Sequence, residues 1–106
     1  MTDAAAHDVE SVRQRVRAEL ARARAEAETA RDLVGQYAGT LVPQASAGLD
    51  AALASYRVGR TDIAMVLEAQ TMLLDYEHDL HRYEALYGTA VADIDRLIGR
   101  PFSEDM

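Results

Sequence analysis

The 106-residue sequence contains no cysteine, no lysine and no tryptophan, and it has only two prolines. Without cysteine, the chain has no disulfide framework, no thiolate metal site and no cysteine nucleophile. Six glycines and 49% hydrophobic residues exclude collagenous and low-complexity chains and argue against wholesale disorder. The formal net charge of −7 disfavours a general nucleic-acid binder.

Long hydrophobic runs are also missing. The longest stretch without a charged residue, 33–49, has 17 residues and includes glycine, glutamine and proline. Because a membrane-spanning helix needs about 20 mostly apolar residues, no span is expected. No basic N-terminal segment is followed by an apolar core, so we expect no signal peptide in this chain.

What the sequence does have is helical periodicity. Apolar residues recur at alternating steps of three and four, the spacing of a coiled-coil seam, and predict a first helix over about residues 8–57. Gly39, Thr40 and Pro43 weaken this helix, so we expect a kink or short interruption near 39–43. The seam is formed by Val9, Val12, Val16, Leu20, Ala23, Ala27, Ala30, Val34, Tyr37, Leu41, Ala45, Leu49, Ala52 and Tyr56.

A second, more regular seam predicts a helix over about residues 63–98, followed by a tail over 99–106 that begins with the helix terminator Gly99. Between the helices, residues 58–62 form the predicted turn. Gly59 suits a left-handed C-cap, and Thr61 or Asp62 suits the next N-cap. The second seam comprises Val66, Ala69, Leu73, Tyr76, Leu80, Tyr83, Tyr87, Ala90, Ile94 and Leu97.

The short break between two long seams predicts an all-α fold: one antiparallel coiled-coil helical hairpin over residues 1–106. The first helix is longer than the second, which leaves Val9, Val12 and Val16 without an intramolecular partner. Near the turn, a further apolar line flanks the main seam, so the hairpin is expected to self-associate into a helical bundle. This line consists of Ile63, Leu67 and Leu74.

Several short motifs follow in order along residues 41–99: Leu41-Val42-Pro43-Gln44-Ala45, Ala54-Ser55-Tyr56-Arg57-Val58-Gly59, Val66-Leu67-Glu68-Ala69-Gln70, Leu73-Leu74, Tyr83 and Leu97-Ile98-Gly99. Together they resemble the TolC-like outer-membrane efflux channel family. A Tyr-x-x-Gly turn followed by Leu-(Asp/Glu)-Ala-Gln is similar to the tip of that family's second coiled-coil hairpin. The Leu-Val-Pro before the turn resembles the heavy-metal subgroup, which serves resistance-nodulation-division pumps.

The resemblance implies the C-terminal periplasmic hairpin of an outer-membrane efflux channel, excised from a longer protein. Family members form trimers, and their hairpin tips close the tunnel and dock a periplasmic adaptor of an inner-membrane pump. The resemblance places Glu68 where the family often has an acidic residue facing the pore. Rings of acidic residues at a constriction select cations. It also implies adaptor contacts at the tip by Tyr56, Arg57, Gly59, Arg60 and Asp62. The simpler interpretation of Tyr56 is a seam residue next to a turn, and that of Glu68 is an exposed helical carboxylate. Gly59 is a turn residue in either case.

A second hypothesis is a stand-alone small helical protein that binds divalent metal. Glu77, His78 and His81 lie close together on the second helix, and imidazole and carboxylate groups suit such an ion. Against it, Arg82 repels a cation and one helix supplies few ligands, so a solvated polar face is the simpler interpretation. A third hypothesis is a generic four-helix dimer.

No catalytic motif is present, and we predict neither an enzyme nor a cofactor. Met65 and Met72, seven residues apart, lie on one face of the second helix. Their thioethers suit copper(I) or silver, but two methionines alone do not make a selective site. Packing between hairpins explains these two residues better.

Overall fold

The computed structural model describes residues 2–99, and all of its regular elements are helices. They are α1 (Thr2–Gln36), the π-helix η1 (Tyr37–Leu41), α2 (Val42–Arg57) and α3 (Ile63–Ile98). The prediction of an all-α helical hairpin is confirmed, and no strand occurs in the described part of the chain. Helix α1 begins at Thr2, ahead of the start expected near residue 8, because the alanines at positions 4–6 favour helix.

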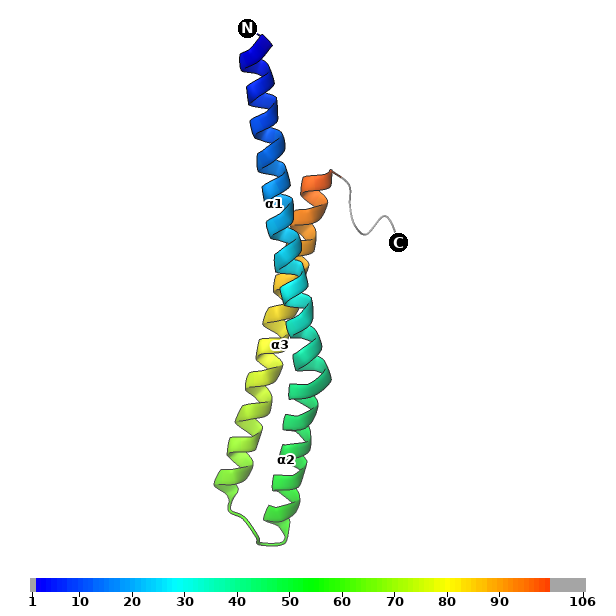
Figure 1. Ribbon diagram of the computed structural model, residues 1–106. Coiled ribbons are helices and arrows are strands. Elements are labelled where there is room, and N and C mark those ends of the chain that lie inside the picture. The colour runs from blue at the N-terminus through cyan, green and yellow to red at the C-terminus, as the bar shows by residue number, and fades with distance from the viewer. Residues whose placement is uncertain (1, 100–106) are drawn as a thin grey trace. The chain divides into compact units, whose positions relative to one another are not determined.

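The chain divides into two compact units. One contains residues 30–85 and forms a hairpin: α2 and the first part of α3 are joined at their ends by the turn (Figure 1). The other pairs the remainder of α1, up to residue 29, with α3 from residue 86 onward. The assignment of residues 1–106 to a single domain stays a prediction.

Seam alanines and a seam valine make up the buried core. The least exposed hydrophobic residues are Ala23, Ala27, Ala30, Ala45, Val66 and Ala90. All six are predicted seam positions, which confirms the periodicity. Small side chains at these places let two helix backbones approach closely. By contrast, Val9, Val12 and Val16 are exposed, as expected for seam residues beyond the reach of the second helix.

The expected irregularity near 39–43 is a single π-helical turn. The N–H of Val42 donates to the carbonyl of Tyr37, five residues earlier. Pro43 explains this geometry, since its ring would crowd the carbonyl of Gly39 in a regular α-helix and it has no N–H to donate. Between positions 37 and 49 the seam takes three successive steps of four residues, one residue more than alternating steps of four and three would take. The wider π-helical turn accommodates this extra residue.

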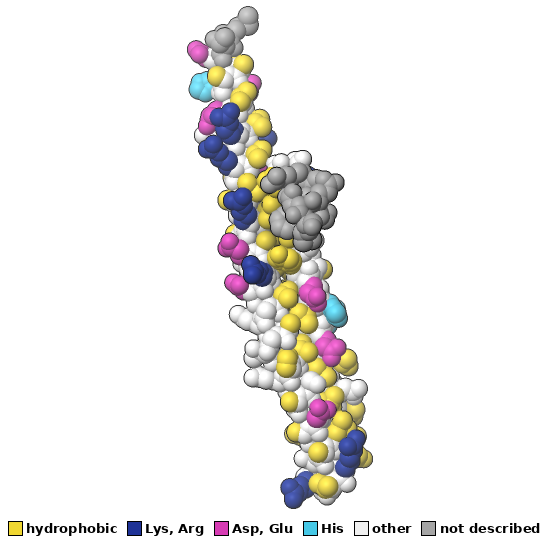
Figure 2. Space-filling model, turned by 90° about the vertical axis from the view of Figure 1, so that its right-hand side faces the viewer, with side chains coloured by type: hydrophobic (Ala, Val, Ile, Leu, Met, Phe, Trp, Pro, Cys, Tyr) yellow, Lys and Arg dark blue, Asp and Glu magenta, His cyan; other side chains and the backbone are white. Residues whose placement is uncertain are grey.

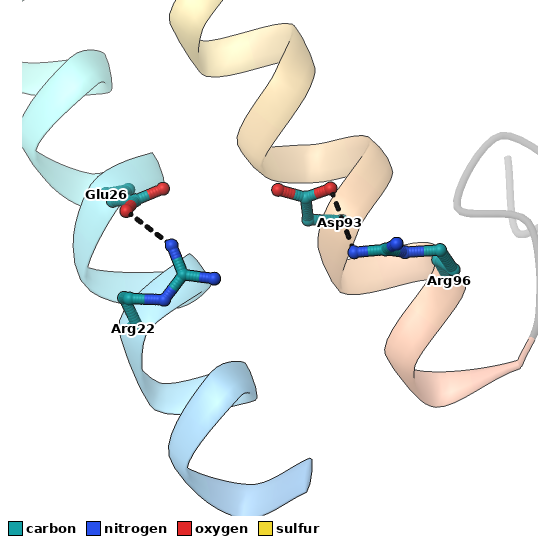
Figure 3. Close-up of polar contacts among 4 residues, drawn as sticks. All are labelled: Arg22, Glu26, Asp93 and Arg96. Carbon is teal, nitrogen blue, oxygen red and sulfur yellow. Dashed lines mark hydrogen bonds and ion pairs between the residues drawn. The ribbon is translucent and has the colours of Figure 1, made fainter. Parts of the chain in front are cut away.

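In the unit that contains α1 up to residue 29 and α3 from residue 86, ion pairs form within single helices. Arg22 Nη1 lies 2.9 Å from Glu26 Oε1 on α1, and Arg96 Nη2 lies 3.4 Å from Asp93 Oδ1 on α3 (Figure 3). Residues three or four apart on a helix are immediate neighbours, which favours such pairs over contacts between helices. Because these side chains are largely exposed, each pair contributes about 0–1 kcal/mol.

Among residues 2–99, no helix is both long enough and apolar enough to span a membrane.

Candidate functional site

The turn between α2 and α3 is the first candidate site, and its backbone geometry is tightly defined. Gly59 has a φ of 77° and its N–H donates to the carbonyl of Tyr56 at 3.0 Å. The N–H of Arg60 donates to the carbonyl of Ser55 at 2.9 Å. These two bonds form a Schellman motif with the glycine in the left-handed position, which satisfies two carbonyls at the end of α2. The prediction of a Gly59 C-cap is confirmed.

The opposite side of the turn is closed by Asp62. Its Oδ1 accepts a hydrogen bond from the N–H of Met65 at 3.2 Å, the geometry of an N-cap for α3. Of the two candidates for this cap, the structure therefore selects Asp62 over Thr61. This hydrogen bond gives Asp62 a structural role, and it draws one carboxylate oxygen toward the helix.

The remaining turn residues present their side chains to solvent. Tyr56 is 45% exposed and Val58 is 68% exposed, while Arg57 and Arg60 are also exposed. Figure 2 shows arginine side chains together with hydrophobic ones at this end of the 30–85 unit. The result is a small apolar surface with two positive charges, carried by a turn that both helix caps hold in place.

Glu68 lies in α3, away from the turn, and its side chain is exposed. It lines a groove of about 390 Å³ between α2 and α3 within the 30–85 unit. Apart from Glu68 and Gln44 the lining is apolar or small, with Leu41, Ala45, Gly48, Ala52, Met65, Ala69, Met72 and Tyr76. The carboxylate is therefore the one charged group on this surface.

The predicted metal ligands are not brought together. His81 Nδ1 lies 3.3 Å from Glu84 Oε1, one turn along α3, and the His81 side chain is 79% exposed. Within residues 2–99, no group of three or more histidine or acidic side chains is placed to hold a metal ion. Glu77, His78 and His81 thus form no metal site within the described residues of one chain, because a single helix supplies few convergent ligands.

A tyrosine cluster that the sequence did not single out lies at the π-helix. The ring centroid of Tyr37 is 5.9 Å from that of Tyr76 and 5.2 Å from that of Tyr83. Arg82 Nη2 donates to Tyr83 Oη at 3.2 Å and lies 3.6 Å from Asp79 Oδ1. The available signal was the placement of all three tyrosines in the seams, which brings them to the same helix interface.

The electrostatics of this cluster follow from its packing. Desolvation raises the pKa of Tyr37, and the nearby Tyr83 and Asp79 raise it further. The hydrogen bond with Tyr83 raises the pKa of Arg82, with a further contribution from Asp79. The Tyr37 phenol therefore keeps its proton more tightly, and the Arg82 guanidinium is held in its charged form. The cluster packs Tyr37 of the π-helix against Tyr76 and Tyr83 of α3 within the 30–85 unit.

Comparison with known proteins gives one result. The model of the outer membrane efflux protein family matches residues 2–100, nearly the whole chain. No curated protein and no solved structure matches the chain. The family consists of transport proteins, not enzymes. On the extent of this match, the chain belongs to the outer membrane efflux protein family.

Proposed function

We propose that this chain forms part of the tunnel wall of an outer-membrane efflux channel and that its hairpin turn docks a periplasmic adaptor protein. The observation that carries the proposal is the family match across residues 2–100. In this proposal the helices lie in the periplasm, several copies assemble into the channel, and the adaptor connects it to an inner-membrane pump.

The geometry of the turn supports adaptor docking. Tyrosine and arginine are the side chains that most often dominate protein interfaces, and Tyr56, Arg57 and Arg60 are exposed there. The Schellman motif at Gly59 and the cap at Asp62 hold the turn in one conformation. A partner that binds this surface therefore pays little for ordering it.

The proposed cargo is metal ions or small toxic compounds. The Leu41-Val42-Pro43 motif, which resembles the heavy-metal subgroup, supports this proposal. Glu68 supports it as well, since an exposed carboxylate repeated around a pore attracts cations.

Adaptor docking is tested in cells that depend on the channel for resistance. We expect Arg57→Glu/Arg60→Glu to lower the tolerated concentration of exported compounds and to abolish cross-linking between channel and adaptor. The matched control is Arg15→Glu/Arg17→Glu, which makes the same charge change at exposed residues of α1 far along the sequence from the turn. Unchanged cross-linking and resistance in the turn variant would refute docking at this site.

Cargo is tested separately with Glu68→Gln, which keeps the shape of the side chain and removes its charge. Cells carrying this variant should lose tolerance to copper, silver and zinc salts more than to ethidium. If the variant lost tolerance to the three metal salts and to ethidium by the same factor, or lost none, at unchanged channel abundance, a cation-attracting role for Glu68 would be wrong.

A further inference from the structure

The groove between α2 and α3 combines apolar walls with a single charged side chain. Its α2 side is hollow because Ala45, Gly48 and Ala52 are small. On its α3 side, Met65 and Met72 are each 52% exposed. The volume of about 390 Å³ lies in the range of pockets that bind drug-sized molecules. A groove of this size and composition favours a ligand that is largely apolar.

The charged side chain, Glu68, stands where the groove adjoins a second hollow. That hollow has a volume of about 530 Å³, and it shares Glu68, Met72 and Tyr76 with the groove. Its other lining residues are Leu67, Thr71 and Asp75. Neither Glu68 nor Asp75 forms an ion pair with any residue of the 2–99 range. Both carboxylates are therefore available to a positively charged ligand.

The surrounding helices add little competing positive charge. The sequence has no lysine, α2 has one arginine at its last position, Arg57, and no arginine lies between residues 60 and 82. Arg82 follows Asp75 by seven residues, about 10 Å along the axis, and lies 3.6 Å from Asp79 Oδ1. At that separation exposed charges are largely screened in physiological salt. The acids of α2 and of α3 up to residue 81 are Asp50, Glu68, Asp75, Glu77 and Asp79.

Tyr76 and the two methionines suit a cation that carries aromatic groups. The Tyr76 ring meets the ring of Tyr37 edge-on, with 5.9 Å between centroids, and this contact holds it at the groove. Tyrosine rings attract cations, and thioether sulfurs make favourable contacts with aromatic rings. Flexible methionine side chains also adapt to ligands of different shape. The walls and the charge together therefore select for an organic cation.

We propose that the groove binds a hydrophobic organic cation of drug size, with its apolar body between Met65, Met72 and the small residues of α2 and its charge beside Glu68. The inference rests on the proposed function, because it names the class of small compound that the surface around Glu68 holds. Loss of the Glu68 charge should affect metal ions more than such cations, since only a ligand with an apolar body keeps its contacts with the walls.

The first test is equilibrium dialysis of the 106-residue chain against tetraphenylphosphonium, a hydrophobic cation without hydrogen-bonding groups. Tetraphenylborate has the same four rings and the opposite charge, and it serves as the matched ligand. The cation should bind saturably and at least about tenfold more tightly than the anion, because a carboxylate about 5 Å away attracts one and repels the other. Equal binding of the two ions, or no saturable binding of the cation, would overturn the proposal.

The location is tested by filling the groove from the α2 side. A Cβ at Gly48 meets no atom within 4 Å, so the side chain of Gly48→Leu can occupy the open groove. Gly88→Leu is the matched control in α3, outside the groove and with equally open space. The first variant should weaken binding of the cation about tenfold, and the second should leave it unchanged. Equal affinities, at equal helicity by circular dichroism, would place the ligand elsewhere and refute the proposal.

The role of the carboxylate is tested with Glu68→Gln. This variant should bind tetraphenylphosphonium about fourfold more weakly, the effect of one charge about 5 Å away in water, and should bind tetraphenylborate more tightly. Glu28→Gln makes the same change at an exposed residue of α1 in the other unit and should alter neither affinity. If both variants weakened binding equally, the cation would be attracted by the net charge of the chain and not by Glu68.

A second copy of the chain is the competing occupant of the groove. Dialysis is therefore repeated over a range of protein concentrations, and sedimentation equilibrium measures self-association under the same conditions. If binding disappears where the chain associates, the groove is an interface between copies and the proposal is wrong. Adaptor cross-linking with the Arg57 and Arg60 variants does not involve the groove, so failure of ligand binding and failure of docking are distinguishable.

Discussion

The ring of Tyr37, the first residue of the π-helix, meets the ring of Tyr76 edge-on, with 5.9 Å between centroids and 82° between planes. Tyr83 contacts the same ring from about two turns further along α3, with 5.2 Å between centroids. The only irregular turn of the described helices is therefore also the place where the hairpin has its aromatic contacts. Aromatic packing thus lies next to Gly39 and Pro43, the residues that weaken the helix.

Removal of the Tyr37 ring should destabilise the hairpin. An aromatic ring that contacts two others contributes packing beyond its buried area, so Tyr37→Ala should lower the melting temperature by roughly 5 °C or more. The control is Tyr56→Ala, which removes an exposed ring at the turn and should change it by less than half as much. Thermal unfolding followed by circular dichroism measures both, and equal effects would contradict a role of the cluster in stability.

The same tyrosine should make stability depend on alkaline pH. The pKa of Tyr37 is raised above the ordinary tyrosine value of 10.0, first by desolvation and then by Tyr83 and Asp79. The folded chain therefore holds this proton more tightly than the unfolded chain. Its contribution to stability is complete below pH 10 and is lost as the pH rises from there through the raised pKa.

Urea unfolding midpoints measured below and above pH 10 give the size of this effect. In Tyr37→Phe the fall at high pH should be smaller than in the wild type, because phenylalanine keeps the ring contacts and has no proton to lose. An identical fall in both proteins would assign the effect to other tyrosines. Absorbance of the ionised phenol reports the titration directly.

Most of the fold could be predicted from the spacing of apolar residues, because burial in a two-helix contact depends on that spacing alone. Ala23, Val66 and Ala90 are buried, and Val9 is exposed, as the two seams require. The π-helix could not be predicted in detail. Periodicity reports how many residues separate seam positions, whereas a kink, a break and a π-turn near Pro43 all satisfy the same spacing.

The candidate sites were less predictable than the fold. Gly59 and Asp62 could be located because left-handed caps and N-caps depend on local sequence. The contact of Tyr37 with Tyr83 depends on the register between two helices, which no local pattern reports. For Glu77, His78 and His81, spacing on one helix showed only proximity along the chain, and a metal site needs convergent ligands.

Loss of the N-cap should weaken the start of α3. Asp62→Ala removes the acceptor of the Met65 N–H bond and should cost about 1 kcal/mol of unfolding free energy. Asp62→Ser should restore most of it, since serine caps comparably well. Asp50→Ala removes an exposed acid from the interior of α2 and serves as the control for charge. A denaturation series in which serine fails to rescue would point to a role for the charge instead of the cap.

The left-handed residue in the turn should respond to substitution in the opposite way to a helical glycine. Gly59 has a φ of 77° and a Cβ there meets no atom within 4 Å, so Gly59→Ala costs only backbone strain, about 1 kcal/mol. Gly59→Val should cost more because its branched side chain tolerates this region poorly. Gly88 lies inside α3 with equally open space, and Gly88→Ala should stabilise the chain by about 0.5–1 kcal/mol. Equilibrium denaturation of the three variants measures the contrast. If alanine stabilised the chain at both glycines, the left-handed turn would be the wrong conformation in solution, and the surface that Tyr56 and Arg60 present beside it would have to be built differently.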